Sequence, residues 1–188
     1  MMPEGVASGV GRDAAGDGEL GNHLVLLVRL DGVPWLADVG FGDGLIEPAL
    51  LVEGPFRQNG YLDFSLERLS TGWWRLNNYP EGSAGSFDFE AKPADPARLQ
   101  KRCTALQSEP TSPFVLNAVV QRHAPGRIET MRGRARKTVS AEGVTRGEIG
   151  SADEYVETLS RVFSIDLPEA ASLWPKIEAR HAVLFGEQ

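Results

Sequence analysis

The sequence predicts an α+β protein whose first part is an antiparallel β-barrel or sandwich. Two apolar runs joined by Asp31-Gly32 indicate a β-hairpin, because this dipeptide favours the tight turns that hairpins use. Short alternating segments separated by turn residues continue to residue 90, as they do in barrels and sandwiches. Helical patterns follow later in the chain, and one of them has a recognisable capped start.

The first 22 residues are predicted to be a flexible lead-in, since Gly, Ala, Asp and Ser dominate residues 3–21. The segment after them has a different pattern. Residues 23–30, His-Leu-Val-Leu-Leu-Val-Arg-Leu, carry apolar side chains on both faces of the predicted strand. We therefore expect this strand to be buried on both sides.

The hairpin should bring His23 and Asp38 together. Counting back from the turn pairs Val25 with Asp38 and His23 with Gly40, so His23 and Asp38 share one face as diagonal neighbours. A buried carboxylate is costly unless it is paired, and a hydrogen bond to the imidazole would satisfy it. A carboxylate that orients an imidazole makes up two members of a nucleophilic triad. The same spacing also fits a purely structural His–Asp pair.

Alternation after the hairpin predicts further strands and a helix. The predicted elements, in order, are strands at 61–69, 73–79 and 86–90 and a helix at 94–106. The inward positions of these strands are Leu62, Phe64, Leu66, Phe87 and Phe89. The helix is expected to bridge to a second unit.

The second unit is predicted to mix strands and helices. Its strands are expected near 114–121, 127–132, 137–140 and 144–148. Ser151 resembles an N-cap, and Glu154 three residues later completes a capping box. A last helix is expected over 168–185, with a kink or break at Pro175.

Composition excludes several classes of protein. A formal net charge of −7 argues against a nucleic-acid partner, because there is no basic excess to displace phosphate counterions. No apolar run reaches transmembrane length and no signal peptide is visible, so we expect no membrane partner. A single cysteine fits a reducing, cytoplasmic location. No cluster has metal-ligand spacing, so no metal is expected, and His123, His181 and the basic run at 132–137 are expected to be surface features.

Two segments resemble the arylamine N-acetyltransferases: His23-Leu-Val-Leu-Leu-Val, and Asp38-Val-Gly-Phe-Gly42 after it. In that family a Thr-His-x-x-Leu-x-Val strand supplies the catalytic His, and Asp-Val-Gly-Phe-Gly supplies the Asp beside the acyl-CoA site. The resemblance extends from His23 to the end of the chain. Its weaker matches are Pro48–Leu51, Trp73-Trp74, Phe87–Phe89, Pro110–Phe114 and residues 115–122.

The resemblance implies an antiparallel β-barrel over 23–106 followed by an α/β lid over 107–188, a cysteine-protease-like superfold lacking its N-terminal helical bundle. It implies acetyl-CoA as acyl donor and an arylamine or hydrazine as acceptor, with ping-pong transfer through a Cys-His-Asp triad. The residues that it marks are catalytic His23 and Asp38, an acyl pocket of Val39, Gly40, Phe41 and Gly42, and coenzyme A contacts at Gly44, Thr111, Ser112 and Phe114.

The nucleophile departs from the family pattern. The family's cysteine stands in an Arg-Gly-Gly-x-Cys-x-Glu-like segment ahead of the His, and no residue before His23 is a cysteine. Cys103, the single thiol, fits a small residue on a solvated helix better than a nucleophile. We expect that the start lies inside a longer reading frame, and that the chain as written is inactive.

Three alternatives stay open. A macrolactam-forming amide synthase of the same family would use the same His and Asp. A non-catalytic binding module or pseudoenzyme would keep the barrel without the chemistry. An unrelated structural barrel would leave His23 and Asp38 apart. No obligate protein partner is evident in any of them.

Overall fold

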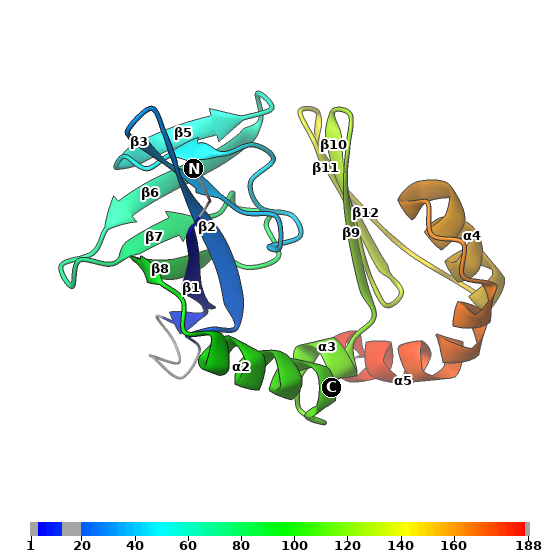
Figure 1. The fold of residues 1–188 in the computed structure, drawn as a ribbon. Helices are drawn as coiled ribbons and strands as arrows, with labels where there is room; N and C mark the ends of the chain where they lie inside the picture. Colours follow the sequence, from blue (N-terminus) through cyan, green and yellow to red (C-terminus); the bar gives the residue numbers. More distant parts are fainter. Residues whose placement is uncertain (1–3, 13–19, 187–188) are drawn as a thin grey trace. The chain divides into compact units, whose positions relative to one another are not determined.

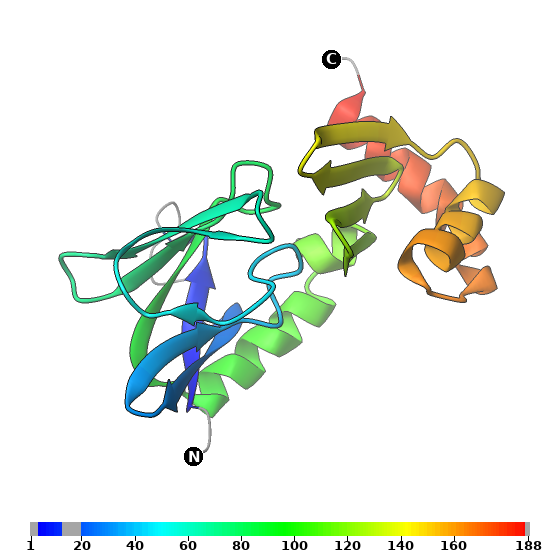
Figure 2. The same cartoon turned by 90° about the horizontal axis from the view of Figure 1, so that it is seen from above.

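The chain divides into two compact units, which Figures 1 and 2 show from two sides. The computed structural model describes residues 4–12 and 20–186. The first unit ends at Ala105 and the second begins at Leu106.

The first unit is built on one antiparallel sheet of eight strands, in the order β4-β3-β2-β1-β8-β7-β6-β5. Its strands are β1 (Glu4–Val10), β2 (His23–Leu30), β3 (Val33–Ala37), β4 (Ala49–Leu50), β5 (Gly54–Gln58), β6 (Leu62–Arg68), β7 (Trp74–Asn77) and β8 (Ser86–Pro93). The sheet curls into a half-barrel (Figure 1), which confirms the α+β class. The barrel is open, because β4 and β5 are its two edges and do not pair with each other.

The β2–β3 hairpin has the predicted register. Leu30 pairs with Val33 and Leu26 pairs with Ala37. Both turn residues have positive φ, 51° at Asp31 and 82° at Gly32, as the tight hairpin turn requires. The turn therefore sets which side chains of the two strands share a face.

The inner face of the sheet forms the core of this unit. The predicted inward residues of β6 and β8 are all at most 2% exposed, which confirms the alternation: they are Leu62, Phe64, Leu66, Phe87 and Phe89. Leu76 of β7 joins them with no exposed surface. Burial of this apolar area is the main stabilising term for the curled sheet.

The prediction of a flexible lead-in is wrong for residues 4–10. These residues form β1, which lies between β2 and β8 in the middle of the sheet. Val6 is fully buried. A Gly- and Ala-rich segment has low intrinsic strand propensity. Here the backbone hydrogen bonds to a strand on each side hold it in the sheet. The rest of the predicted lead-in includes residues 13–19, which lie outside the described residues.

The expectation that β2 is buried on both faces is also wrong. Val25, on the face of His23, has no exposed surface. On the opposite face, Leu24 is 43% exposed and Leu30 is 61% exposed. The sheet curls around one face only, so it covers the inner side chains and leaves the outer ones partly open.

The two edge strands have no clear sequence pattern. β4 is two residues long, and β5 contains Pro55. Proline removes a ladder hydrogen bond and is tolerated in a sheet chiefly at an edge, which is where β5 lies. Helix α2 (Pro96–Ser108) follows β8 at the position predicted for a helix.

The second unit contains a four-stranded antiparallel sheet in the order β12-β11-β10-β9. Its elements are α3 (Pro113–Leu116), β9 (Val119–Ala124), β10 (Arg127–Arg132), β11 (Ala135–Ser140), β12 (Gly143–Glu148), α4 (Ala152–Phe163), the 3₁₀ helix η2 (Pro168–Leu173) and α5 (Trp174–Phe185). Met131 and Ile149 pack with residues of α4, η2 and α5 to form its core.

In this unit one prediction from the sequence is wrong and two are confirmed. The predicted strand at 114–121 begins too early, because Ser112 caps the short helix α3 and the chain extends only after Asn117. Ser151 caps α4 as predicted, by accepting a hydrogen bond from the Glu154 amide. Pro175 stands in the first turn of α5, where it ends η2 and starts a new helix. No helix in the described residues is long and apolar enough to cross a membrane.

Candidate active site

His23 and Asp38 form a buried pair at the end of the hairpin. The Nε2 atom of His23 lies 2.8 Å from Oδ2 of Asp38. The side chain of His23 is 9% exposed and that of Asp38 has no exposed surface. His23 is the first residue of β2 and Asp38 follows β3, so the hairpin register brings the two side chains together. The predicted contact is confirmed, and an unrelated barrel with these residues apart is excluded.

The contacts of the Asp38 carboxylate define which imidazole nitrogen carries the proton. Its Oδ1 atom accepts a hydrogen bond from the Gly40 amide at 2.9 Å, which fixes the carboxyl group. An ionised carboxylate can only accept, so the bond at Oδ2 requires a proton on Nε2 of His23. In the neutral ring, Nδ1 then has a free lone pair and can act as a base.

Two aromatic rings hold the imidazole in place. The ring of Phe87 lies 5.1 Å from that of His23, and the ring of Phe41 lies 5.4 Å from it. Phe41 and Phe87 also contact each other at 5.1 Å between centroids. These ring contacts restrict rotation of the imidazole and keep the site largely dry.

The glycine-rich loop after Asp38 passes close to the free edge of the imidazole. A Cβ atom on Gly40 would lie 3.4 Å from Cε1 and 3.9 Å from Nδ1 of His23. Gly42 has a φ of +78°, which side chains rarely adopt. The backbone of this loop therefore lies one Cβ contact away from the ring.

Replacing Gly44 with alanine is expected to destabilise the protein by about 1–3 kcal/mol. The added Cβ would lie 2.7 Å from Cδ1 and 3.1 Å from Cβ of Phe41, so this side chain, which contacts His23, must shift. Urea unfolding measures the effect. Gly85→Ala is the matched control, because a Cβ there meets nothing within 4 Å. Equal losses in the two variants would contradict this account of the loop.

A second buried carboxylate, Asp43, anchors the far end of the loop. It has no exposed surface, and its oxygens accept hydrogen bonds from the amide of Ser83 at 2.8 Å and from its hydroxyl at 2.7 Å. Burial, and after it the charge of Asp43, raise the pKa of Tyr79 well above its usual range, so the phenol stays protonated. The loop is tied down at both ends by carboxylates.

Gln58 fixes the chain beyond the loop. Its Oε1 atom accepts the Ile46 amide at 2.8 Å, and its Nε2 atom donates to the Glu47 carbonyl at 2.7 Å. Sequence reasoning missed Asp43, Ser83 and Gln58. Asp43 could have been suspected, because it is a carboxylate inside a glycine-rich loop, whereas its partners come from distant segments.

The residues of the expected acyl pocket, Val39, Gly40, Phe41 and Gly42, belong to this loop. Val39 is 94% exposed, and Gly40 and Gly42 are exposed as well. Phe41 is half-buried against His23. Of this group, the structure brings Gly40 and Phe41 to the imidazole and leaves the Val39 side chain in solvent.

The expected coenzyme A contacts fall in both units. Gly44 is buried beneath Phe41 in the first unit. In the second unit Thr111 is exposed and Phe114 is 69% exposed. The Ser112 hydroxyl donates to the Leu106 carbonyl at 2.6 Å and accepts from the Phe114 amide, so it serves the helix cap.

The remaining predictions concern one cysteine and two histidines. Cys103 lies exposed on α2, as expected for a residue of a solvated helix. His123 and His181 are more enclosed than predicted, since each has a buried Nδ1 without a hydrogen-bond partner in the described residues. No group of three metal-ligating side chains occurs within residues 4–12 and 20–186.

Comparisons with known proteins show the family and the fold. A family model described as N-acetyltransferase matches residues 4–172. A comparison with curated proteins finds no match. The arylamine N-acetyltransferase of Mycobacterium marinum, solved in complex with CoA, has a TM-score of 0.79 and 22% identity, over 95% of this chain and 68% of that one.

Two other solved structures are similar. The enzyme from M. tuberculosis has a TM-score of 0.78 and 21% identity, over 95% of this chain and 69% of that one. The enzyme from Salmonella typhimurium has a TM-score of 0.77 and 17% identity, over 95% of this chain and 68% of that one. At these identities the structural likeness establishes the fold, while the family match covers most of the sequence.

Proposed function

This chain belongs to the arylamine N-acetyltransferase family, and from that premise we propose that it serves acetyl transfer from acetyl-CoA to the nitrogen of an arylamine or hydrazine. The observation that carries the proposal is the buried 2.8 Å contact between His23 and Asp38. A solved neighbour that binds CoA supports the choice of donor.

In the proposed mechanism His23 is the proton carrier. Its Nδ1 atom takes the proton of a cysteine thiol, and Asp38 stabilises the resulting imidazolium. The thiolate sulfur attacks the acetyl carbonyl, the bond from that carbon to the CoA sulfur breaks, and the departing CoA thiolate receives the proton from Nδ1. The backbone of the glycine loop borders the ring edge where this exchange occurs.

The second half-reaction transfers the acetyl group to the acceptor. The amine nitrogen attacks the acetyl-cysteine thioester, and His23 takes a proton from that nitrogen. The carbon–sulfur bond then breaks, which releases the amide and regenerates the thiolate beside the imidazolium. Exposed Thr111 and Phe114 are proposed to contact coenzyme A, whereas Gly44 and Ser112 support the backbone.

The thiol for this chemistry is not assigned to Cys103. The family resemblance places the nucleophile in a segment ahead of the His, and Cys103 follows it on an exposed helix. We therefore propose that the 188-residue polypeptide alone forms no acyl-enzyme.

Incubation of this polypeptide with acetyl-CoA, followed by intact mass spectrometry, is expected to show no added acetyl group. Loss of a triad's nucleophile removes nearly all covalent catalysis, about 10⁶-fold in the serine protease case. Alkylation of Cys103 with iodoacetamide, in the same buffer, is the control that shows the thiol is reactive. A stable acetyl adduct on Cys103 would overturn the assignment.

Genomic DNA upstream of the Met1 codon distinguishes catalysis from the pseudoenzyme alternative. An in-frame segment that encodes Arg-Gly-Gly-x-Cys would supply the thiol and support acetyl transfer. A stop codon directly ahead of Met1, without such a segment, would contradict the proposed function.

A further inference from the structure

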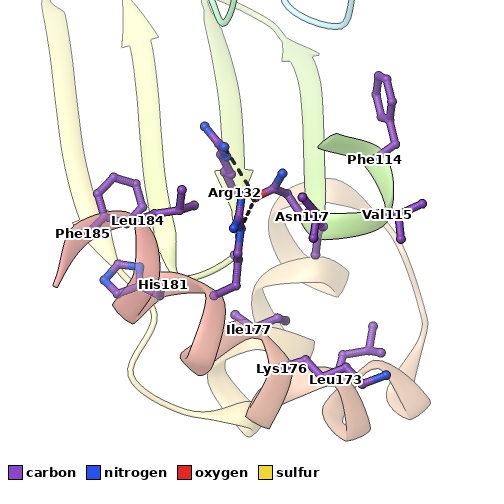
Figure 3. A pocket seen from close by; sticks show the side chains of 14 residues that line it. Phe114, Val115, Asn117, Arg132, Leu173, Lys176, Ile177, His181, Leu184 and Phe185 are labelled. Atoms are coloured by element: carbon purple, nitrogen blue, oxygen red, sulfur yellow. Dashed lines mark hydrogen bonds between the residues drawn. The ribbon is translucent and has the colours of Figure 1, made fainter. Parts of the chain in front are cut away.

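The second unit contains a cavity with an apolar and positively charged lining. It has a volume of about 280 Å³ and lies between α3, the end of β10 and α5 (Figure 3). Most of its lining is apolar: Phe114 and Val115 come from α3, and Ile177, Leu184 and Phe185 come from α5. The volume lies just below the usual range for ligand pockets, which suits a molecule with one ring or a short chain.

The polar part of the lining is positively charged. Arg132, Lys176 and Arg180 all line the cavity. The side-chain oxygen of Asn117 accepts a hydrogen bond from Nε of Arg180 at 3.1 Å and a longer one from Nη2 of Arg132 at 3.5 Å, as the dashed lines in Figure 3 show. Two guanidinium groups thus converge on one neutral oxygen.

No carboxylate balances these charges. In the part of the chain that the structure describes, no acidic side chain forms an ion pair with Arg132, Lys176 or Arg180. Glu148 pairs with Arg134 at 3.5 Å and with His181 of the lining at 3.5 Å. This excess of positive charge stands out in a chain whose formal net charge is −7.

We propose that this cavity binds a small organic carboxylate, an anion with an apolar body of one ring or a short alkyl chain. The carboxylate replaces Asn117 as the acceptor for Arg132 and Arg180, whose forked donors match two oxygens. The apolar body packs against Ile177 and Leu184. The His23–Asp38 pair is not involved, so the inference does not rest on the proposed function. Phe114, which is proposed to contact coenzyme A, also lines the cavity, but the carboxylate uses Arg132, Arg180, Ile177 and Leu184 instead.

Titration calorimetry of the full 188-residue chain with octanoate tests this inference. Octanoate is expected to bind at least ~10-fold more tightly than 1-octanol, which lacks the charge, and than acetate, which lacks the apolar body. Inorganic phosphate is expected to bind more weakly than octanoate. Equal binding of octanol, or stronger binding of phosphate, would overturn the proposal.

Two variants place the binding in this cavity. Arg132→Met and Arg180→Met keep the apolar stem and remove the charge, and each is expected to weaken octanoate binding by about 10- to 100-fold. Octanol binding should not change. Arg161→Met on α4 is the matched control, because Arg161 is 78% exposed and pairs with Glu157. Unchanged octanoate binding in both cavity variants would contradict the assignment.

A competition experiment separates this site from that of the acetyl donor. Saturating CoA is expected to leave the octanoate affinity unchanged. Displacement of octanoate by CoA would show that the cavity belongs to the cosubstrate site and would overturn the inference, while leaving the proposed function intact. If acetyl-transfer activity were absent, octanoate binding to this cavity would still be expected.

Discussion

Asp38→Asn is expected to slow acetyl transfer by about 10⁴-fold, as the equivalent change does in the serine protease triad. The Gly40 amide donates to Oδ1 of Asp38, so the oxygen of the new amide would keep this bond. Its NH₂ group would then face Nε2 of His23. A donor facing Nε2 forces the ring proton onto Nδ1, which removes the lone pair that takes the proton of the thiol.

The rate of acetyl transfer has to be measured in a protein that has a cysteine thiol beside His23. A fusion of this chain to the Cys-bearing N-terminal segment of a solved relative supplies one, and acetylation of an arylamine by acetyl-CoA gives the readout. Asp63→Asn is the matched control: Asp63 is 59% exposed and pairs with Arg57, so a change of less than about twofold is expected. Activity of Asp38→Asn within tenfold of the parent fusion would refute the proposed role of Asp38.

Phe87→Ala is expected to lower the free energy of unfolding by about 3–5 kcal/mol. Phe87 is 1% exposed and contacts the rings of His23, Phe41 and Phe89. Its removal leaves a void at the centre of the inner face that these neighbours cannot fill without leaving their own positions. The variant therefore also frees the imidazole from one of its two supporting rings.

Urea unfolding followed by tryptophan fluorescence measures this loss, since Trp74 is buried in the same sheet. Phe114→Ala removes the same atoms from a ring that is 69% exposed, and a change of no more than about 0.5 kcal/mol is expected. If Phe87→Ala cost as little as this control, the packing of His23 described above would be wrong.

The site was predictable from sequence because it is local. His23 and Asp38 belong to one hairpin, and the Asp31-Gly32 turn fixes its register. Once the register is set, side-chain alternation leaves no freedom over which residues share a face. The inward positions of β6 and β8 followed from the same alternation.

The parts that sequence reasoning missed depend on contacts between distant segments. β1 has little strand propensity, and it is ordered because β2 and β8 pair with both of its edges. Asp43 is anchored by Ser83, which lies 40 residues away in the sequence. The sequence separation of these two residues matches no known motif, so their hydrogen bond is visible only in the folded structure.

The sequence predicted one of two helix N-caps, and the length of the helix explains the difference. Ser151 precedes a long periodic segment, so its cap was visible. Ser112 caps only the four residues of α3, which is too short for a periodic pattern. The apolar residues of α3 therefore resembled a strand in the sequence, although three of them line the cavity of the second unit.

The protonation of the His23 ring tests the central claim most directly. ¹⁵N NMR of histidine-labelled protein separates the two ring nitrogens, and a His23→Gln spectrum assigns this residue among the three histidines. With the imidazole neutral, the proton is expected on Nε2 and the lone pair on Nδ1, and Asp38→Asn should reverse them. A proton on Nδ1 in the unmodified protein, or a tautomer that Asp38→Asn does not change, would contradict the account.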